Sequence, residues 1–549
     1  MDKKLILGIL AAIPVTMMGQ SAVDAYNISQ GNLRGTARYM SMAGAFTALG
    51  GDMSTLNQNP AGIGIYRSSE ASLTLALDNL STKSEADGFS STKSRTPFSC
   101  NNVGYIGTVR LPSEVMPFFN WGFSYSTLAR FNRHYSGRLT DNLQTSYTNY
   151  IADYTSAEGI GGNILGETTG YNPYMQSNAP WSSILAYNAY GINPTAPGAD
   201  SYVGLFNYDS TQPGSAEYQI SESGHIDEYS INFGGNLYNT VYWGLGFGIT
   251  DIDFKQEAYY GEAFTDANVP NAAGDAYTSG DASMGLSNYK HIWGSGFNVK
   301  FGLIFKPINE LRLGFAVHTP TWYNLSQEGG AAMHYLYNSP TYPNGENYNG
   351  SFTTDPDGFD WDYQTPWRIM AGVAGVIGGR AIVSLDYEYK AFDKAVIKDA
   401  NSNEYVDMTS DVKTYFRPTN TIRVGAEYRL TPQWSIRAGY SYETSPVKSE
   451  LLDPTGDSAT CIYTSGPDDT ETQPSFTWSR DTQHFTLGLG YRYKAFSVDL
   501  AYVHRSRKSD YHAFTDYNEN AEPYYLVVAP QAKLTDNDNS FVLSLSYKF

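Results

Sequence analysis

Cysteine, charge and long apolar runs are all scarce in this chain of 549 residues. Its two cysteines, Cys100 and Cys461, lie far apart and show no CxxC spacing, so they do not predict a metal site. Only 17% of the residues are charged, which is below the roughly 25% of typical soluble proteins. Beyond the first twenty residues, no uncharged apolar run reaches the roughly 18 residues that a membrane-spanning helix needs. The composition therefore excludes a bundle of membrane helices.

Basic residues are also few. The chain has 36 Lys and Arg against 55 Asp and Glu, which gives a net charge of −19. A nucleic-acid partner is not expected, since such proteins need a basic face. Aromatic residues and glycine are abundant instead. The chain has 45 Tyr, 26 Phe and 9 Trp, together with 52 Gly. So many aromatic residues exclude a disordered chain. This composition favours an all-β protein.

The N-terminus has the pattern of an exported protein. Lys3 and Lys4 precede an apolar stretch over residues 5–15, and small residues follow near Gly19 and Ser21. This order predicts a secretory signal peptide over residues 1–20, too short to span a membrane as a mature helix.

Strict alternation of apolar and polar residues is the strongest signal in the rest of the chain. In the last nine residues, the odd positions from Phe541 to Phe549 are all Phe, Leu or Tyr, and the even positions include Ser544, Ser546 and Lys548. Such a period of two predicts a strand with one apolar face. Fourteen segments of this kind are centred near Leu75, Gly107, Ser126, Ile231, Gly246, Phe301, Phe315, Ala371, Leu385, Gly425, Gly439, Gly488, Leu500 and Ser544.

The connections between these segments alternate between short and long. Short ones include residues 112–120, 238–240, 307–310, 378–380, 431–433 and 494–495; long ones include 136–223, 259–287, 326–359, 450–475 and 510–537. Short periplasmic turns, long external loops and an even strand number are typical of outer-membrane barrels. We therefore predict a 14-stranded antiparallel transmembrane β-barrel over residues 68–549, in the bacterial outer membrane and in contact with its lipid. The alternative is a large soluble sandwich or propeller, but no repeat of fixed length supports it.

Residues 21–67 do not alternate, and we predict that they form an N-terminal hatch inside the barrel lumen. Small residues fill the stretch from Met40 to Asp52, and small side chains allow close packing in a confined space. The Gly50–Gly51 pair ends any short helix, and Asn59–Pro60 favours a turn.

With GTARYMSMAGAFTAL at residues 35–49 and NPAG at residues 59–62, the sequence resembles a family of outer-membrane transporters for hydrophobic compounds, typified by the long-chain fatty acid and toluene transporters. The resemblance rests on these two stretches, which are similar to the family's hatch and Asn-Pro-Ala motif. Later stretches are also similar: LRLGFAVHTP at 311–320, TPWRIMAG at 365–372, SIRAGYSYETSP at 435–446, and the last strand ending in Phe549.

The resemblance implies passive uptake of hydrophobic or amphiphilic small molecules, captured by external loops, passed through a hatch-gated barrel and released laterally into the bilayer. Asn59, Pro60, Ala61 and Gly62 would form the gating turn; alternatively, they only fold the hatch into the barrel. Phe549 would be recognised by the barrel-insertion machinery, and a monomer is expected. Two other functions stay open: a porin-like channel for polar solutes, and a surface receptor or adhesin, for example one that binds haem.

Charged residues divide into two groups. The loop between Arg138 and His225 contains no Lys or Arg, and neither do residues 326–359, so an acidic, aromatic entrance favours neutral ligands. Strand alternation instead points several cations inward, because each would cost about 2–4 kcal/mol on the lipid face. We expect them to pair with inward acids and the hatch, or to hold a ligand carboxylate. These candidate lumen cations are Lys300, Arg312, Arg368, Arg423, Arg437 and Arg492.

No catalytic or cofactor motif is found. The eight histidines show no HxxxH spacing, and neither a Gly-x-Ser-x-Gly elbow nor a nucleotide-binding loop is present. We therefore expect neither an enzyme nor a cofactor. Cys100 and Cys461 both fall near the predicted external end, where a disulfide between them is possible.

Overall fold

The structure is a computed structural model that describes residues 22–453, 470–518 and 526–549. The predicted signal peptide and Cys461 lie outside these residues, so both the signal peptide and the disulfide stay predictions. No helix in the described ranges is both long and apolar enough to cross a membrane.

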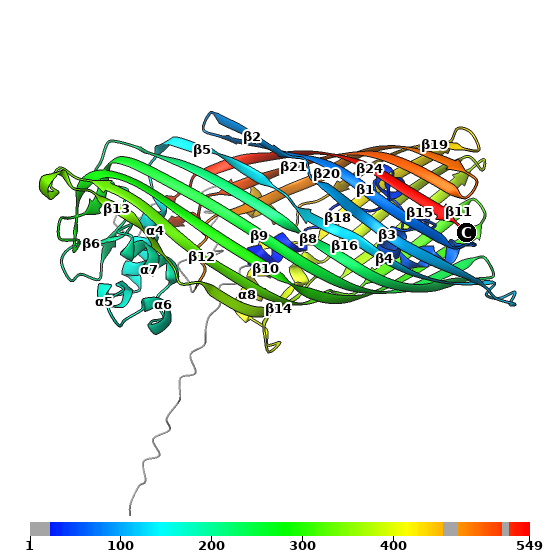
Figure 1. Cartoon of the computed structure of the whole chain (residues 1–549), viewed down its shortest axis with the longest axis horizontal. Coiled ribbons are helices and arrows are strands. Elements are labelled where there is room, and N and C mark those ends of the chain that lie inside the picture. The colour runs from blue at the N-terminus through cyan, green and yellow to red at the C-terminus, as the bar shows by residue number, and fades with distance from the viewer. Residues whose placement is uncertain (1–21, 454–469, 519–525) are drawn as a thin grey trace, which may run out of the picture.

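Fourteen antiparallel strands form a closed barrel (Figure 1). Each strand pairs with the next, and the ladder between the first and the last strand closes the ring, with Leu77 opposite Phe541. All fourteen predicted strand centres lie within these strands, so the predicted barrel is confirmed. The strands are β1 (Glu70–Ala86), β3 (Phe98–Arg110), β4 (Phe118–Phe131), β8 (Gly214–Leu237), β9 (Val241–Pro270), β10 (Tyr277–Ile308), β11 (Leu311–His318), β15 (Arg368–Ile377), β16 (Ala381–Lys390), β18 (Thr419–Arg429), β19 (Trp434–Glu443), β20 (Phe476–Tyr493), β21 (Phe496–His512) and β24 (Gln531–Lys548).

The strand faces explain why the chain closes into a barrel. Phe247 and Ile249 on β9 are exposed on the outer face, whereas Gly246 and Gly248 between them are buried on the inner face. Similar outward apolar residues on every wall strand form a continuous band, which lipid covers. Closure leaves no unpaired strand edge within that band, where no water could satisfy it.

Additional strands extend the wall at the external end, on the left in Figure 1. They are β2 (Phe89–Arg95), β5 (His134–Leu143), β12 (Trp322–Asn338), β13 (Tyr348–Thr353), β14 (Asp357–Gln364) and β17 (Val396–Asp399). The expectation that residues 259–287 form a long loop is wrong, because β9 and β10 run on to a short turn between Pro270 and Tyr277. The alternation fades there because both faces carry polar residues above the lipid band.

The longest connection, predicted over residues 136–223, also contains more regular structure than expected. It contains β5, the first part of β8, and four helices, which pack on the external end of the barrel (Figure 1). These helices are α4 (Tyr147–Ala157), α5 (Gly162–Leu165), α6 (Pro173–Gln176) and α7 (Trp181–Asn188), and the small strands β6 (Asn193–Pro194) and β7 (Tyr202–Val203) follow them.

An N-terminal segment (residues 22–67) lies inside the barrel. It comprises α1 (Ala22–Ser29), α2 (Ala37–Ser41), α3 (Thr55–Gln58) and the 3₁₀ helix η1 (Pro60–Ile65). The wall that it contacts is lined with glycine: a Cβ added at Gly244 would lie 2.1 Å from the carbonyl oxygen of Pro60, and one at Gly314 would lie 2.1 Å from that of Thr47. Only glycine allows this close approach of two backbones.

Two short helices fill the external side between β17 and β20. The first is α8 (Val406–Tyr415) and the second is α9 (Ser449–Leu452). Residues of α8 join a buried aromatic cluster around Tyr26 of α1, whose ring stacks on Phe416 at 5.1 Å between centroids. The remaining short elements are η2 (Pro343–Gly345), η3 (Phe392–Lys394), β22 (Tyr517–Asn518) and β23 (Leu526–Val527).

Candidate ligand-binding cavities

Two cavities lie in the lumen on either side of the N-terminal segment. Cavity 1 has a volume of about 120 Å³ and cavity 2 one of about 250 Å³. Gln30, Asn32, Leu33 and Arg34 line both cavities, so this stretch of the N-terminal segment separates them. Any molecule that passes from one cavity to the other must displace this partition.

Both cavities are basic, although the chain as a whole is acidic. The lining of cavity 1 contains eight Lys and Arg against four Asp and Glu. The lining of cavity 2 contains eight against three. Some of these cations are paired with carboxylates behind the lining, as Arg34 is with Asp78 at 2.8 Å and Arg130 with Asp227 at 3.5 Å. The net charge that acts inside each cavity is therefore smaller than the lining alone indicates.

Three of the arginines that line cavity 1 form a cluster, and two of them, Arg505 and Arg507, also line cavity 2. Arg133 and Arg507 both bind Asp536, with nitrogen–oxygen distances of 3.1 and 3.0 Å. Arg505 binds Asp538 through its Nε at 2.8 Å. This arginine cluster (Arg133, Arg505, Arg507) therefore shares two directly bound carboxylates, and Glu222 also lines cavity 1 close to Arg133 and Arg507.

The arginine cluster also holds the partition. Arg507 donates a hydrogen bond to the side-chain oxygen of Gln30 at 2.5 Å, and Arg505 donates one to that of Asn32 at 3.3 Å. Both acceptors are neutral amides, which bind guanidinium groups less strongly than carboxylates do. An anionic ligand would therefore compete well for the same donors.

A buried ion pair connects α1 to the wall. Lys290 of β10 lies 2.8 Å from Asp24 of α1 and 2.7 Å from Glu471. All three side chains are almost fully buried, so they bind one another in place of water.

Most of the predicted lumen cations lie inside and have partners. Lys300 pairs with Glu228, and Arg312 donates to the carbonyl oxygen of Leu49 at 2.7 Å. The others share carboxylates: Arg368 and Arg423 bind Glu388, and Arg437 binds Glu427 and Asp499. Glu427 also binds Arg38 of the N-terminal segment at 2.9 Å.

The position of Arg492 differs from that of the other five predicted lumen cations. It is exposed beside the turn between β20 and β21, and no ion pair of the described residues includes it. It lies four residues beyond Gly488, which approaches Ser41 of the N-terminal segment, and its expected place among the lumen charges stays a prediction.

The Asn-Pro-Ala-Gly turn contacts the wall through Asn59. Its side-chain nitrogen donates to the carbonyl oxygens of Thr47 at 2.6 Å and of Leu303 on β10 at 3.3 Å. Its side-chain oxygen accepts a hydrogen bond from the backbone N–H of Ala61 at 3.1 Å, while Pro60 and Gly62 lie in η1. One buried amide therefore connects two parts of the N-terminal segment and a wall strand.

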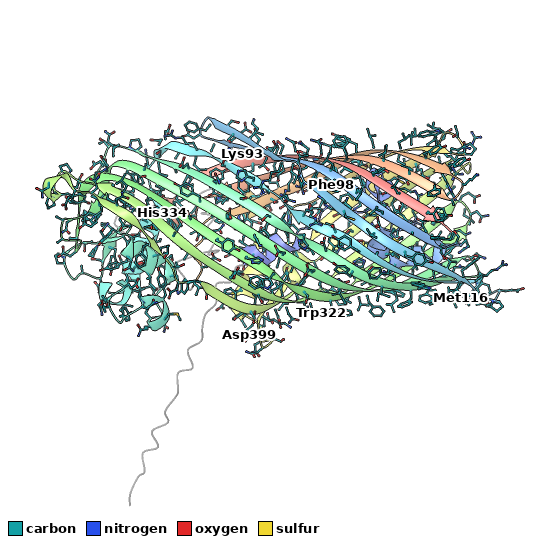
Figure 2. The ribbon with its side chains drawn as sticks, in the orientation of Figure 1. Lys93, Phe98, Met116, Trp322, His334 and Asp399 are labelled. Atoms are coloured by element: carbon teal, nitrogen blue, oxygen red, sulfur yellow. The ribbon has the colours of Figure 1, made fainter. Side chains whose placement is uncertain are left out.

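The wall has a seam where cavity 1 reaches its edge. The last ladder pair between β3 and β4 is Asn102 with Ser126, and the described strand pairings include no ladder between β2 and β5. Cavity 1 is lined at this point by residues 93–95 of β2 and 130–135 around the β4–β5 bend. Figure 2 shows Lys93 at this seam and Phe98 farther along the wall. Lys93 and Arg95 are exposed there, and the ion pairs found in the described ranges include neither.

The sequence interpretation missed the arginine cluster. Arg133 lies between strands, and Arg505 and Arg507 lie beyond the apolar part of β21, where the alternation is weak. A usable signal was nonetheless present: Arg505 and Arg507 face Asp538 and Asp536 across the β21–β24 ladder, two residues apart on each strand. Matching opposite charges at a spacing of two on paired strands predicts an inward ion-pair network.

A closed barrel with an outward apolar band and an internal plug defines a transmembrane protein of the bacterial outer membrane. Residues 229–466 match the family model described as outer membrane protein transport protein (OMPP1/FadL/TodX), so the predicted resemblance is confirmed over this part. Three of the later similar stretches fall within the match. No protein with curated annotation matches the sequence.

Solved structures of this kind are similar over nearly the whole chain. A FadL homologue of Pseudomonas aeruginosa is 15% identical, with 95% of this chain and 100% of the other covered and a TM-score of 0.48. The toluene transporter TodX of P. putida is 14% identical, with coverages of 94% and 99% and a TM-score of 0.45. The toluene transporter TbuX of Ralstonia pickettii is 13% identical, with coverages of 94% and 99% and a TM-score of 0.43. Because these sequence identities and TM-scores are low, the assignment of the fold rests on the strand pairing described above.

Proposed function

We propose that the protein takes up amphiphilic molecules with an acidic head group passively through the outer membrane. The observation that carries this proposal is the basic lining of both lumenal cavities, in which cations outnumber acids by two to one or more. A carboxylate or other acid is costly to bury without a cation, and the arginine cluster supplies one. An apolar tail needs the shelter of a protein to cross the headgroup region.

The acidic external loops do not rule out such a ligand. Charges on exposed loops are separated from an approaching head group by water and salt, which screen them over roughly 8 Å at physiological ionic strength. The lumenal cations are buried and far less screened. Attraction by the cavity therefore outweighs repulsion at the rim once the head group has passed the loops.

The hatch responds to the ligand in this account. The acid head group replaces Gln30 on Arg507 and Asn32 on Arg505, because a charged acceptor binds a guanidinium more strongly than a neutral amide does. Loss of these two contacts frees the partition between the cavities. The NPAG turn, held by Asn59, keeps the remainder of the hatch on the wall.

The seam between β2 and β5 is the route of lateral release into the bilayer. Cavity 1 reaches this seam, and the edges there lack a shared ladder. Lys93 and Arg95 at the rim provide cations for the departing head group while the tail enters the lipid.

Equilibrium binding of oleate and of methyl oleate to the purified barrel tests the proposal. The two probes share a tail and differ in the acid, so at least a tenfold preference for oleate is expected, and Arg507→Met abolishes it. Arg429→Met is the matched control, because Arg429 is exposed at the turn end of β18 and leaves the preference unchanged. Equal binding of the two probes, or tighter binding of the ester, refutes the proposed ligand class.

A further inference from the structure

A shallow groove lies on the outer face of the wall, above the lipid-facing band. Its volume is about 560 Å³, and it crosses strands β8, β9, β10 and β12. The floor is formed by small residues, among them Ser287, Gly330 and Ala332, and Tyr259 and Tyr289 lie along it. No function described so far uses this surface.

Tyrosine rings border the floor of the groove. Tyr259 lies over two glycines: a Cβ added at Gly261 would lie 2.7 Å from its hydroxyl oxygen, and one at Gly285 would lie 2.8 Å from its Cε2 atom. The ring is therefore flat against the sheet. Tyr289, next to Glu257 in the β9–β10 ladder, is 40% exposed.

The height of the groove follows from the outward residues of β9. Phe247 and Ile249 belong to the outward apolar band, Asp251 and Asp253 follow on the same face, and Tyr259 lies ten residues beyond Ile249. At about 3.3 Å per residue and a strand tilt of about 40°, Tyr259 lies roughly 25 Å above Ile249. Figure 2 shows the same progression on β12, from Trp322 to His334 near the external end.

We propose that this groove binds the saccharide part of a glycolipid of the outer leaflet. Half-exposed tyrosine rings offer flat apolar surfaces to the C–H faces of sugar rings at low cost in side-chain entropy. Small residues between them leave room for a ring to lie on the sheet.

Polar side chains beside the rings complete the site. Glu257 and Gln219 are exposed on β9 and β8, and Gln219 is the ladder partner of Tyr259. Their carboxylate and amide groups can accept and donate hydrogen bonds to sugar hydroxyls. A binding surface at this height faces the sugars of the leaflet and neither its tails nor free solutes.

Native mass spectrometry of the detergent-solubilised barrel tests the site with two probes in buffer containing Mg²⁺. The probes are lipopolysaccharide with a complete core oligosaccharide and lipid A without core sugars. We expect the barrel to retain the core-bearing probe at least tenfold better than lipid A. Tyr259→Ala and Tyr289→Ala reduce that preference about tenfold each, and Ala332→Trp, which fills the floor, removes it.

Tyr277→Ala is the matched control, because Tyr277 is exposed on the same face of β10 outside the groove and its removal leaves binding unchanged. Retention of the folded, heat-modifiable band on electrophoresis shows that each variant keeps its barrel. Equal retention of the two probes by the wild type, or groove variants that bind like the wild type, overturns the proposal.

Discussion

Lys290 of β10 binds Asp24 of α1 at 2.8 Å in a nearly dry environment. The pair joins the first helix of the N-terminal segment to the barrel wall, and Glu471 completes it from the opposite side. This ion pair therefore helps, together with the aromatic cluster around Tyr26, to position α1, which lines both cavities.

Replacement of this lysine loosens α1. In Lys290→Met, two buried carboxylates lose their shared cation, which costs about 3–5 kcal/mol when one partner of a buried pair is removed. Amide hydrogen exchange of residues 22–34 then becomes faster by a factor of one hundred or more. Lys83→Met is the control, because its pair with Glu85 is exposed and contributes little. Unchanged exchange in Lys290→Met contradicts the role of this ion pair.

Neutralising Asp536 strengthens oleate binding. Asp536→Asn removes the carboxylate that binds both Arg133 and Arg507, so more positive charge is free for the ligand. We expect binding to tighten about three- to tenfold, measured by equilibrium dialysis, even though the barrel becomes less stable. A purely structural arginine cluster predicts weaker binding in this variant, as in Arg507→Met, so the two directions separate the explanations.

Asn59 holds the NPAG turn on the wall. Asn59→Ala removes two donated hydrogen bonds and one accepted one, at about 1 kcal/mol each, and leaves buried backbone groups without these partners. We expect transient openings in planar-bilayer recordings that the wild type lacks.

Asn57→Ala supplies the comparison for Asn59→Ala, because Asn57 accepts only one long hydrogen bond, from Ser230 at 3.3 Å. Recordings of Asn59→Ala that match those of the wild type would mean that the turn does not gate the lumen. Large steady conductance in the wild type would instead favour a porin-like channel.

Helix α4 responds to pH through Glu262. This carboxyl accepts hydrogen bonds from the backbone N–H of Tyr147 and the hydroxyl of Ser146, and burial raises its pKa from 4.5 to about 7. Because the folded state keeps a proton that the unfolded state has lost, stability is full below pH 4.5 and falls as the pH rises towards 7.

The expected loss is about 3 kcal/mol across that window, seen as faster hydrogen exchange in residues 147–157. Glu262→Gln, which stays neutral, removes the dependence on pH. Asp266→Asn is the control and keeps the dependence on pH, because Asp266, four residues later on β9, is only partly buried. Protection factors, which correct for the intrinsic rise of the exchange rate with pH, would stay constant in the wild type if Glu262 were ionised throughout.

The barrel could be predicted from the sequence because lipid imposes a strict rule. Every wall strand must present apolar groups outward, as Phe541 and Leu543 do, and the alternation marks all fourteen strands. Outside the lipid band this rule no longer applies. The sequence near Tyr259 therefore predicts a loop, although these residues belong to β9.

The cavities could not be predicted in the same way. Charge matching between β21 and β24 indicates the Arg507–Asp536 pair, but Arg133 joins it only because a distant part of the chain folds back onto these strands, and sequence spacing does not contain that information. The acidic loops favoured a neutral ligand, since loop charges are visible in the sequence whereas the net charge of a cavity is not. For Arg492 the limit is a different one, because alternation gives the face of a residue but not its depth.

Photo-cross-linking of a diazirine-bearing fatty acid to the purified barrel in lipid nanodiscs tests the central claim most directly. The account predicts cross-links in peptides that contain residues 93–95 and 130–135, because the ligand passes from cavity 1 through the seam. It also predicts that excess oleate prevents these cross-links and that methyl oleate does not. Cross-links confined to the periplasmic turns, or equal protection by both competitors, would contradict it.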